Sequence, residues 1–148
     1  RFTPVTTLDN NIRLFDDYAH HPVEIEAVLE SARAVTKGRV IGVMQPHRYS
    51  RLRDLFEGFC ASMNGADTVL VTPVFEAGET PIEGFHSAAL AEGLRAHGHR
   101  HVIHVEDNDK LADVLAKEIQ ADDVVIFMGA GSISAMAYAV AEKLGGSV

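Results

Sequence analysis

Short runs of β-branched and apolar residues alternate along the chain with segments whose apolar residues recur every three or four positions. Five such runs are short and largely apolar on successive residues, as is typical of strands that are covered on both faces of a sheet. They are Ile12–Phe15, Val40–Met44, Thr68–Val71, Val102–Val105 and Val124–Met128. We expect a β-strand at each of them. The first run is also compatible with an antiparallel edge strand.

The segments with helical periodicity predict five helices, each with one apolar stripe. The stripes are Ile25, Val28, Leu29 and Ala32; Leu52, Leu55, Phe56, Phe59, Cys60 and Met63; Leu90, Ala91 and Leu94; Leu111, Val114, Leu115 and Ile119; and Ile133, Met136, Ala137, Val140 and Leu144. The second stripe predicts one continuous helix.

Residues with strong positional preferences stand at the expected helix ends. Pro22 is placed to start the first helix, and Asp107 is one of three candidates for the N-cap of the fourth. Gly98 is placed to end the third helix and Gly145 the last. The alternation of strands and helices predicts a Rossmann-like, three-layer α/β sandwich, with a mostly parallel sheet of five to six strands and helices on both faces. We expect residues 1–148 to form a single domain.

Composition narrows the class of protein. Hydrophobic residues make up 47% and charged residues 23% of the 148 residues, which is typical of a globular domain. The net charge of −8 argues against nucleic acid or an anionic membrane as a general partner. No apolar run approaches the roughly 18 residues of a membrane span. A single cysteine, Cys60, excludes an internal disulfide framework and indicates a cytoplasmic location.

The polar residues that stand out follow the predicted strands. In open parallel α/β sheets, ligands bind beyond the carboxyl ends of the strands. The loops at these ends are 16–22, 45–51, 72–84 and 129–132. We therefore expect the functional site to be formed by these loops.

Two arginines in the second of these loops indicate an anion site. Arg48 and Arg51 are three residues apart, so a helix that starts there presents both on one face. A cation in the first turn of a helix costs about 0.3–1 kcal/mol. Free backbone N–H groups and paired guanidiniums together form a receptor for a carboxylate or a phosphate. The alternative is that these arginines form internal ion pairs with Asp16 or Glu76.

The first loop holds two carboxylates and two histidines, which are compatible with a metal, with proton transfer or with ligand contact. The adjacent carboxylates of Asp16 and Asp17 are expected to point to opposite sides of an extended chain. The alternative is a solvated strand end in which one histidine caps the next helix. No second cluster completes a standard zinc ligand set, so we predict no metal site. Gly129-Ala130-Gly131 either lets the backbone approach an anion or serves tight packing, and the sequence leaves both open.

Four stretches together resemble the C-terminal domain of the UDP-N-acetylmuramate–L-alanine ligases, which are members of the Mur ligase family. The stretches are Asp16-Asp17-Tyr18-Ala19-His20-His21-Pro22, Gln45-Pro46-His47-Arg48-Tyr49-Ser50-Arg51-Leu52-Arg53-Asp54-Leu55, Ala77-Gly78-Glu79 and Gly129-Ala130-Gly131. They occur in the family's order and span nearly the whole chain. The stretch that begins at His47 distinguishes the chain from the related murein-peptide recycling ligases.

The resemblance implies an ATP-dependent ligase of bacterial peptidoglycan precursor synthesis. In this family ATP phosphorylates the carboxylate of UDP-N-acetylmuramate, and the amine of L-alanine attacks the acyl phosphate. ATP and Mg are held mainly by a central domain with a P-loop, and the pattern Gly-x-x-x-x-Gly-Lys-Ser/Thr does not occur in this chain. The resemblance therefore implies a closing, amino-acid-binding domain that is inactive alone.

The resemblance also implies roles for individual residues. Arg48 and Arg51 are similar to the family's pair that holds the carboxylate of L-alanine. His20 is similar to a catalytic-site residue beside the incoming alanine. Asp17 and Tyr18 are similar to contacts with nucleotide and substrate on domain closure. Ser132 stands where some members carry an acidic or amide residue, so the resemblance gives that loop no role.

Two other classes of protein compete with the ligase interpretation. A receiver-type signalling module needs an aspartate after its central strand and a lysine after a later one, but the strand ends here carry Thr72, Glu106 and Gly129. A free-standing nucleotide- or carboxylate-binding α/β module fits the same rim of polar loops. A recycling-ligase domain is the third alternative, from within the same family.

Overall fold

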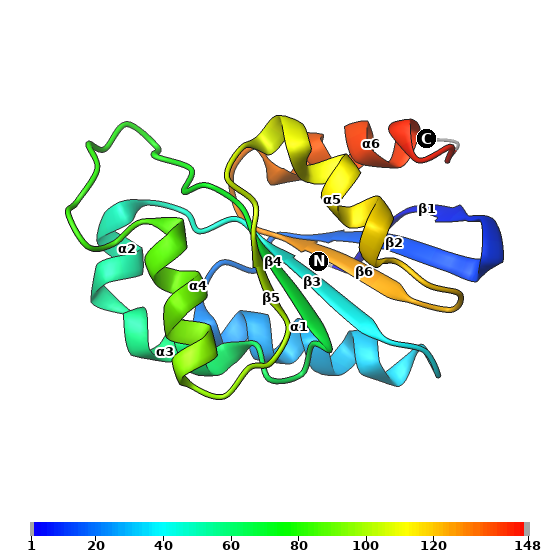
Figure 1. Cartoon of the computed structure of the whole chain (residues 1–148), viewed down its shortest axis with the longest axis horizontal. Helices are drawn as coiled ribbons and strands as arrows, with labels where there is room; N and C mark the ends of the chain where they lie inside the picture. Colours follow the sequence, from blue (N-terminus) through cyan, green and yellow to red (C-terminus); the bar gives the residue numbers. More distant parts are fainter. Residues whose placement is uncertain (1, 147–148) are drawn as a thin grey trace.

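The computed structural model describes residues 2–146 and contains a six-stranded sheet between two layers of helices (Figure 1). The strands are β1 (Thr3–Leu8), β2 (Ile12–Asp17), β3 (Val40–Met44), β4 (Thr68–Val71), β5 (Val102–His104) and β6 (Val124–Met128). Their order across the sheet is β1-β2-β6-β3-β4-β5. All neighbouring pairs are parallel except β1 and β2. This confirms the predicted mostly parallel α/β fold.

The helices are α1 (Pro22–Ala34), α2 (Tyr49–Asp54), α3 (Phe56–Ser62), α4 (Ser87–Ala96), α5 (Leu111–Glu118) and α6 (Ile133–Lys143), with 3₁₀ turns η1 (Asp9–Asn11) and η2 (Asn108–Lys110). The predicted end signals are confirmed at Pro22, Gly98 and Gly145. The prediction for the fourth helix is wrong, because the N-cap of α5 is Lys110 and Asp107 instead caps the preceding turn η2. Within the described part of the chain, no helix is long and apolar enough to cross a membrane.

Each face of the sheet has its own hydrophobic core. One core is formed by α1, α3 and α4, and the other by α5 and α6. The two central strands, β3 and β6, are buried along their whole length because helices cover both of their faces. The continuous apolar runs in the sequence follow from this burial.

The chain reverses direction across the sheet between β3 and β6. After β3 the chain moves outward through β4 and β5, and β6 then returns to the other side of β3. The loop after β3 leads to α2 and α3 on one face, while the loop after β6 leads to α6 on the other. Such a reversal opens a crevice at the carboxyl ends of the two strands, which is where open α/β sheets bind ligands.

Strand β1 is not predicted by the sequence pattern, and the expectation that Ile12–Phe15 could be an antiparallel edge is wrong. That run belongs to β2, which lies between β1 and β6. The antiparallel edge is β1, and it contains Pro4, whose missing N–H is tolerated at a sheet edge. Asn10 and Asn11 form the connecting turn with φ of 62° and 58°. The Asp-Asn-Asn turn between two strand-like runs is the signal that predicts this hairpin.

The predicted continuous helix over residues 52–63 is interrupted at Leu55. Leu55 has a φ of −119° and lies between α2 and α3. It is 37% exposed although it belongs to the apolar stripe. The two short helices bury different side chains, Leu52 in α2 and Phe59 in α3. Both side chains belong to the same core, so the break divides the predicted helix into two segments that each contribute to it.

Ion pairs hold the amino ends of the central strands. Arg39 donates to the buried carboxylate of Asp123 at 2.8 Å, and Arg33 donates to Asp67 at 2.5 Å. Asp67 also accepts from the backbone N–H of Val40 at 2.8 Å. The guanidiniums of Arg33 and Arg39 are thus paired with carboxylates of the chain itself.

Close packing between α3 and α4 gives the first prediction. A Cβ added at Gly93 would lie 2.4 Å from Cys60 Sγ and 3.1 Å from the Phe56 ring. We expect Gly93→Ala to lower the free energy of unfolding by about 1–2 kcal/mol, because the steric cost exceeds the gain in helix propensity. Urea unfolding measures this change. The substitution should cost less in a Cys60→Ala background, and an equal cost in both backgrounds would contradict the packing account.

Candidate functional site

The loops after β2, β3, β4 and β6 meet at one rim of the sheet. The loop after β3 is joined to the loop after β4 by paired backbone hydrogen bonds between Pro46, Arg48 and Phe75, each 2.8 Å long. The loop after β3 is also joined to the start of α6, because Gln45 Oε1 accepts from the N–H of Ile133 at 3.1 Å. The rim is therefore one connected structure, as the sequence analysis expected.

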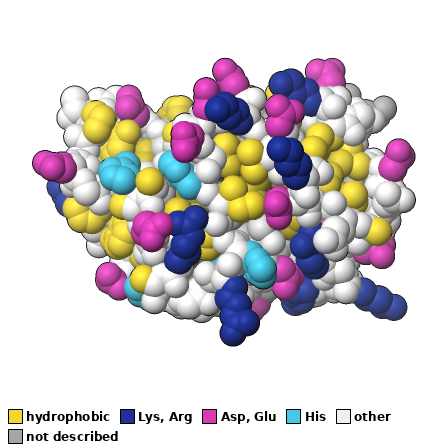
Figure 2. Space-filling view, in the orientation of Figure 1, with side chains coloured by type: hydrophobic (Ala, Val, Ile, Leu, Met, Phe, Trp, Pro, Cys, Tyr) yellow, Lys and Arg dark blue, Asp and Glu magenta, His cyan; other side chains and the backbone are white. Residues whose placement is uncertain are grey.

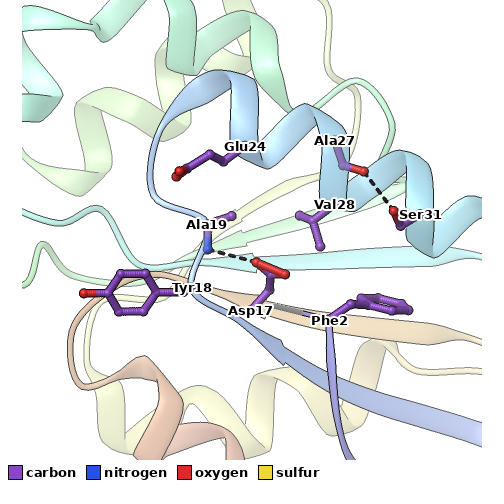
Figure 3. Close-up of a pocket in the computed structure, with 8 residues that line it drawn as sticks. All are labelled: Phe2, Asp17, Tyr18, Ala19, Glu24, Ala27, Val28 and Ser31. Carbon is purple, nitrogen blue, oxygen red and sulfur yellow. Dashed lines mark hydrogen bonds between the residues drawn. The ribbon is translucent and has the colours of Figure 1, made fainter.

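The two adjacent carboxylates at the end of β2 point to opposite sides, as predicted. Asp16 accepts from Ser134 Oγ at 2.6 Å on the α6 side. Asp17 is 9% exposed and accepts from the N–H of Ala19 at 3.0 Å on the α1 side. There it borders a pocket of about 430 Å³, drawn in Figure 3, which is lined by Phe2, Asp17, Tyr18, Ala19, Glu24, Ala27, Val28 and Ser31. The Tyr18 ring extends away from the Asp17 carboxylate and is 63% exposed.

His20 is fixed by its own loop. Its Nδ1 lies 2.8 Å from the Tyr18 carbonyl oxygen, and its backbone N–H donates to Glu24 at 3.1 Å. This bond and one from the N–H of His21 hold the pKa of the Glu24 carboxyl below its usual value. His21 occupies the N-cap of α1, so the expectation that one histidine caps this helix is confirmed. His20 itself faces the next loop, with its ring 6.0 Å from that of His47.

The structure places the two arginines of interest at the start of α2, but not both inside the helix. Arg48 is the N-cap residue, with φ of 74° and an exposed side chain. Arg51 is half-buried, and its Nη1 donates to His47 Nδ1 at 3.0 Å and to the His47 carbonyl oxygen at 3.3 Å. The prediction that both arginines lie in the first turn is therefore wrong for Arg48, which stands one residue before the helix.

The alternative of internal ion pairs is contradicted among the described residues. Neither Arg48 nor Arg51 forms an ion pair with a carboxylate of residues 2–146. Asp16 instead bonds Ser134, as described above, and Glu76 accepts from the Tyr49 hydroxyl at 3.4 Å. Acidic and basic side chains are interspersed over the face seen in Figure 2, which carries no broad patch of one charge. The rim thus carries two guanidiniums, close in sequence, that form no ion pair with a described carboxylate.

One of the backbone N–H groups that the sequence predicts to be free at the start of α2 is occupied. The N–H of Ser50 donates to Glu79 Oε1 at 3.0 Å, and the Ser50 hydroxyl donates to the other oxygen of the same carboxylate. The Ser50 N–H is therefore not available to an external anion. The Ala77-Gly78-Glu79 stretch was part of the resemblance, but its partner was not apparent from the sequence.

The Gly129-Ala130-Gly131 loop serves close packing. A Cβ at Gly131 would lie 2.4 Å from the Phe75 ring, and one at Gly129 would lie 2.8 Å from the Ile133 side chain. The buried Gln45 side chain accepts from the Ile133 N–H, so the first amide of α6 is also occupied from within. Gln45 and Phe75 are the residues that sequence reasoning missed here. Of the two alternatives left open, the geometry matches packing.

His47 is neutral in this arrangement. Because a guanidinium can only donate hydrogen bonds, His47 Nδ1 must accept the bond from Arg51. Burial lowers the pKa of His47, and the nearby charges of Arg51, His20 and Arg48 lower it further, while Glu79 opposes them. A neutral ring adds no competing charge beside the arginines.

The metal-ligating side chains of the described residues do not gather into a cluster. Across residues 2–146 there is no group of three or more His, Cys, Asp or Glu side chains that could hold a metal ion. The rim therefore offers no such cluster among its described residues.

These features define a doubly wound α/β domain with a cationic rim, and comparison with known proteins identifies its family. The family model described as "Mur ligase, glutamate ligase domain" matches residues 1–131, and the chain belongs to that family. The chain is 52% identical over 144 residues to a UDP-N-acetylmuramate–L-alanine ligase of Phenylobacterium zucineum, and 55% identical over 135 residues to one of Xanthobacter autotrophicus. These matches cover 97% and 91% of this chain, but only 30% and 29% of those proteins.

Solved structures agree with this assignment. The UDP-N-acetylmuramate–alanine ligase of Thermotoga maritima matches 97% of the chain with a TM-score of 0.77 and 27% identity, over 29% of its own length. A domain from a putative UDP-N-acetylmuramate:L-alanyl-γ-D-glutamyl-diaminopimelate ligase of Haemophilus ducreyi matches 97% of this chain and 99% of its own, with a TM-score of 0.72 and 23% identity. The second likeness shows the fold alone.

The lowered pKa of His47 gives the second prediction. A histidine whose pKa is lower in the folded state binds protons more readily when unfolded, so it destabilises the fold as the pH falls below 6.5 and contributes nothing well above it. We expect the free energy of unfolding of this chain to fall less over that range in His47→Asn, which keeps an acceptor for Arg51. Urea unfolding at a series of pH values measures the slope.

A second histidine provides the comparison for this experiment. Burial also lowers the pKa of His104, which contacts Ser87 Oγ at 2.8 Å. His104→Gln is therefore expected to reduce the same slope. An unchanged slope in His47→Asn together with a reduced one in His104→Gln would contradict the neutral state assigned to His47.

Proposed function

We propose that this chain is the C-terminal domain of a cytoplasmic, ATP-dependent ligase that adds L-alanine to UDP-N-acetylmuramate in peptidoglycan precursor synthesis. Identity of more than 50% over at least 91% of the chain to proteins of that name carries the proposal. The same relatives favour this activity over that of a murein-peptide recycling ligase. On this proposal residues 1–148 form one domain, which spans about 30% of such a ligase.

The proposed role of Arg48 and Arg51 is to hold the carboxylate of L-alanine. A guanidinium forms short, charge-assisted hydrogen bonds to a carboxylate, and two of them fix its orientation. The absence of a carboxylate partner for either arginine within residues 2–146 supports this role. The pair lies on an open surface, so the opposite wall of the binding site belongs to another part of the full-length enzyme.

His20 is proposed to lie beside the amine of alanine. Its Nδ1 lies next to the Tyr18 carbonyl oxygen. A carbonyl oxygen only accepts hydrogen bonds, so this contact favours the tautomer in which Nδ1 carries the proton. In the neutral ring Nε2 then carries the lone pair and accepts a hydrogen bond from the alanine nitrogen. Holding the nitrogen in this way orients it for attack, and orientation alone contributes several kcal/mol to such reactions.

Asp17 and Tyr18 are proposed to contact nucleotide and substrate when the domains close. The exposure of Tyr18 and the pocket beside Asp17 support this role. ATP is the proposed co-substrate, and Mg supplies charge neutralisation at its phosphates when bound. Both are proposed to be held mainly by the central domain of the full-length ligase, because the described residues of the rim form no cluster that could hold the ion.

Removing either arginine in the full-length ligase is the third prediction. We expect Arg48→Ala or Arg51→Ala to raise the KM for L-alanine about 10- to 100-fold, as expected for the loss of a charged hydrogen bond, with little change in the KM for ATP. Steady-state kinetics measures both. Arg53→Ala is the matched control, because Arg53 is exposed and pairs with Asp54 at 2.9 Å. An unchanged dependence on alanine in both arginine variants would refute the carboxylate role.

The activity of this chain by itself is the fourth prediction. We expect residues 1–148 to unfold cooperatively in urea but to show no ATP turnover with UDP-N-acetylmuramate and L-alanine, because the chain contains no P-loop sequence. Phosphate release by the purified chain measures turnover. Genuine turnover that co-purifies with the chain would overturn the proposal that it is a closing domain.

A further inference from the structure

The start of α2 breaks the usual rule for a helix N-terminus. The N-cap position normally holds a side chain that accepts a hydrogen bond from the second or third N–H of the helix. Here it holds Arg48, whose guanidinium has no acceptor, and its φ of 74° is rare for a residue other than glycine. A cation at this end of the helix is also disfavoured by the helix dipole. Local sequence therefore does not explain why the helix begins here.

A carboxylate from a distant loop supplies the hydrogen-bond acceptor that the Arg48 side chain lacks. Glu79 lies 29 residues beyond Ser50 in the chain, and its two carboxylate oxygens accept hydrogen bonds from the backbone N–H and the hydroxyl of Ser50. These hydrogen bonds, together with the positive charge of Arg48, hold the pKa of the Glu79 carboxyl below its usual value. Glu79 therefore performs the capping function and places a negative charge beside the arginine.

Glu79 is held in place by a compact turn. Ala77 and Gly78 have φ of 53° and 85°, and the N–H of Glu79 donates to the carbonyl oxygen of Glu76 at 3.0 Å. The Glu76 carboxylate in turn accepts from the Tyr49 hydroxyl at 3.4 Å. Both acidic side chains of the turn therefore contact the first two residues of α2.

The same segment also contacts Arg48 itself and His47 before it. The N–H of Arg48 donates to the carbonyl oxygen of Phe75, and the Phe75 ring stacks on that of His47 with centroids 5.3 Å apart. In Figure 1 the long green loop between β4 and α4, to which this segment belongs, runs past α2. We call residues 75–79 the brace.

We propose that Glu79 is a positioning residue for the substrate carboxylate, acting through the brace to fix the start of α2 and hence the guanidiniums of Arg48 and Arg51. Because Glu79 already occupies the Ser50 N–H, a second carboxylate is directed to the guanidiniums. This inference rests on the proposed function, in which that carboxylate belongs to L-alanine.

The experiment compares Glu79→Ala and Glu79→Gln in the full-length ligase. We expect Glu79→Ala to raise the KM for L-alanine about five- to tenfold, with the KM for ATP and kcat changed less than about twofold. Glu79→Gln keeps one acceptor for the Ser50 N–H, so the increase should be smaller. Glu83→Ala is the matched control, because Glu83 is an exposed acid of the same loop without a hydrogen bond or ion pair to any described residue.

Coupling between the two ends of the contact separates positioning from a general loss of structure. Ser50→Ala removes one of the two donors to Glu79. If the brace acts through this contact, Ser50→Ala should raise the KM for alanine less in the Glu79→Ala background than in the wild type. Amide hydrogen exchange of the 148-residue chain gives a readout without activity, since Glu79→Ala should increase the exchange rate of the Ser50 N–H selectively.

The outcomes distinguish this inference from the proposed function. A higher KM for alanine in the Arg48 and Arg51 variants, with no change in Glu79→Ala, would overturn the role of Glu79 and leave the proposed function standing. Unchanged alanine kinetics in the arginine variants would overturn both. Equal changes in every kinetic constant of Glu79→Ala, or additive effects with Ser50→Ala, would show a purely structural role. A selective and coupled increase in the KM for alanine supports the inference.

Discussion

The start of helix α2 is capped by a carboxylate that comes from another loop, and the geometry of the cationic rim depends on that contact. Glu79 accepts two hydrogen bonds from Ser50, so the residue at the N-cap is released from the capping role. Arg48 can occupy that position only because the missing acceptor and the unfavourable charge are both compensated by Glu79. The left-handed φ of Arg48 belongs to the same arrangement, since its N–H is held by the carbonyl oxygen of Phe75.

The ion pairs of Arg33 and Arg39 at one end of the sheet have no counterpart among the described residues for Arg48 and Arg51 at the other. At the amino ends of the strands, Arg33 and Arg39 are paired with Asp67 and Asp123, and these contacts fix the strands and their turns. At the carboxyl ends, next to the reversal between β3 and β6, the guanidiniums at the start of α2 form no ion pair with the described carboxylates. Unpaired positive charge in a rim held by internal hydrogen bonds is what the capture of a small anion requires. The N–H of Ser50 at the start of α2 and that of Ile133 at the start of α6 are bonded within the chain, so the electrostatic attraction falls mainly to the guanidiniums.

The sequence predicts those features that depend on neighbouring residues, and it does not predict those that depend on contacts between residues far apart in the chain. The buried strands β3 and β6 follow from continuous apolar runs, and the rim follows from polar loops at their carboxyl ends. Strand β1 is half-exposed and is defined by its partner β2, so its own pattern is weak. The break at Leu55 depends on the packing of two short helices. The contacts of Glu79 with Ser50 and of Gln45 with Ile133 join residues 29 and 88 positions apart, and no local pattern encodes them.

A crystal structure of the full-length ligase with its alanylated product bound tests the central claim most directly. The account predicts that the alanyl carboxylate lies about 2.8 Å from donor nitrogens of both Arg48 and Arg51. It also predicts that Glu79 remains bonded to Ser50. A carboxylate bound to the Ser50 N–H with Glu79 displaced, or one held away from both arginines, would contradict it.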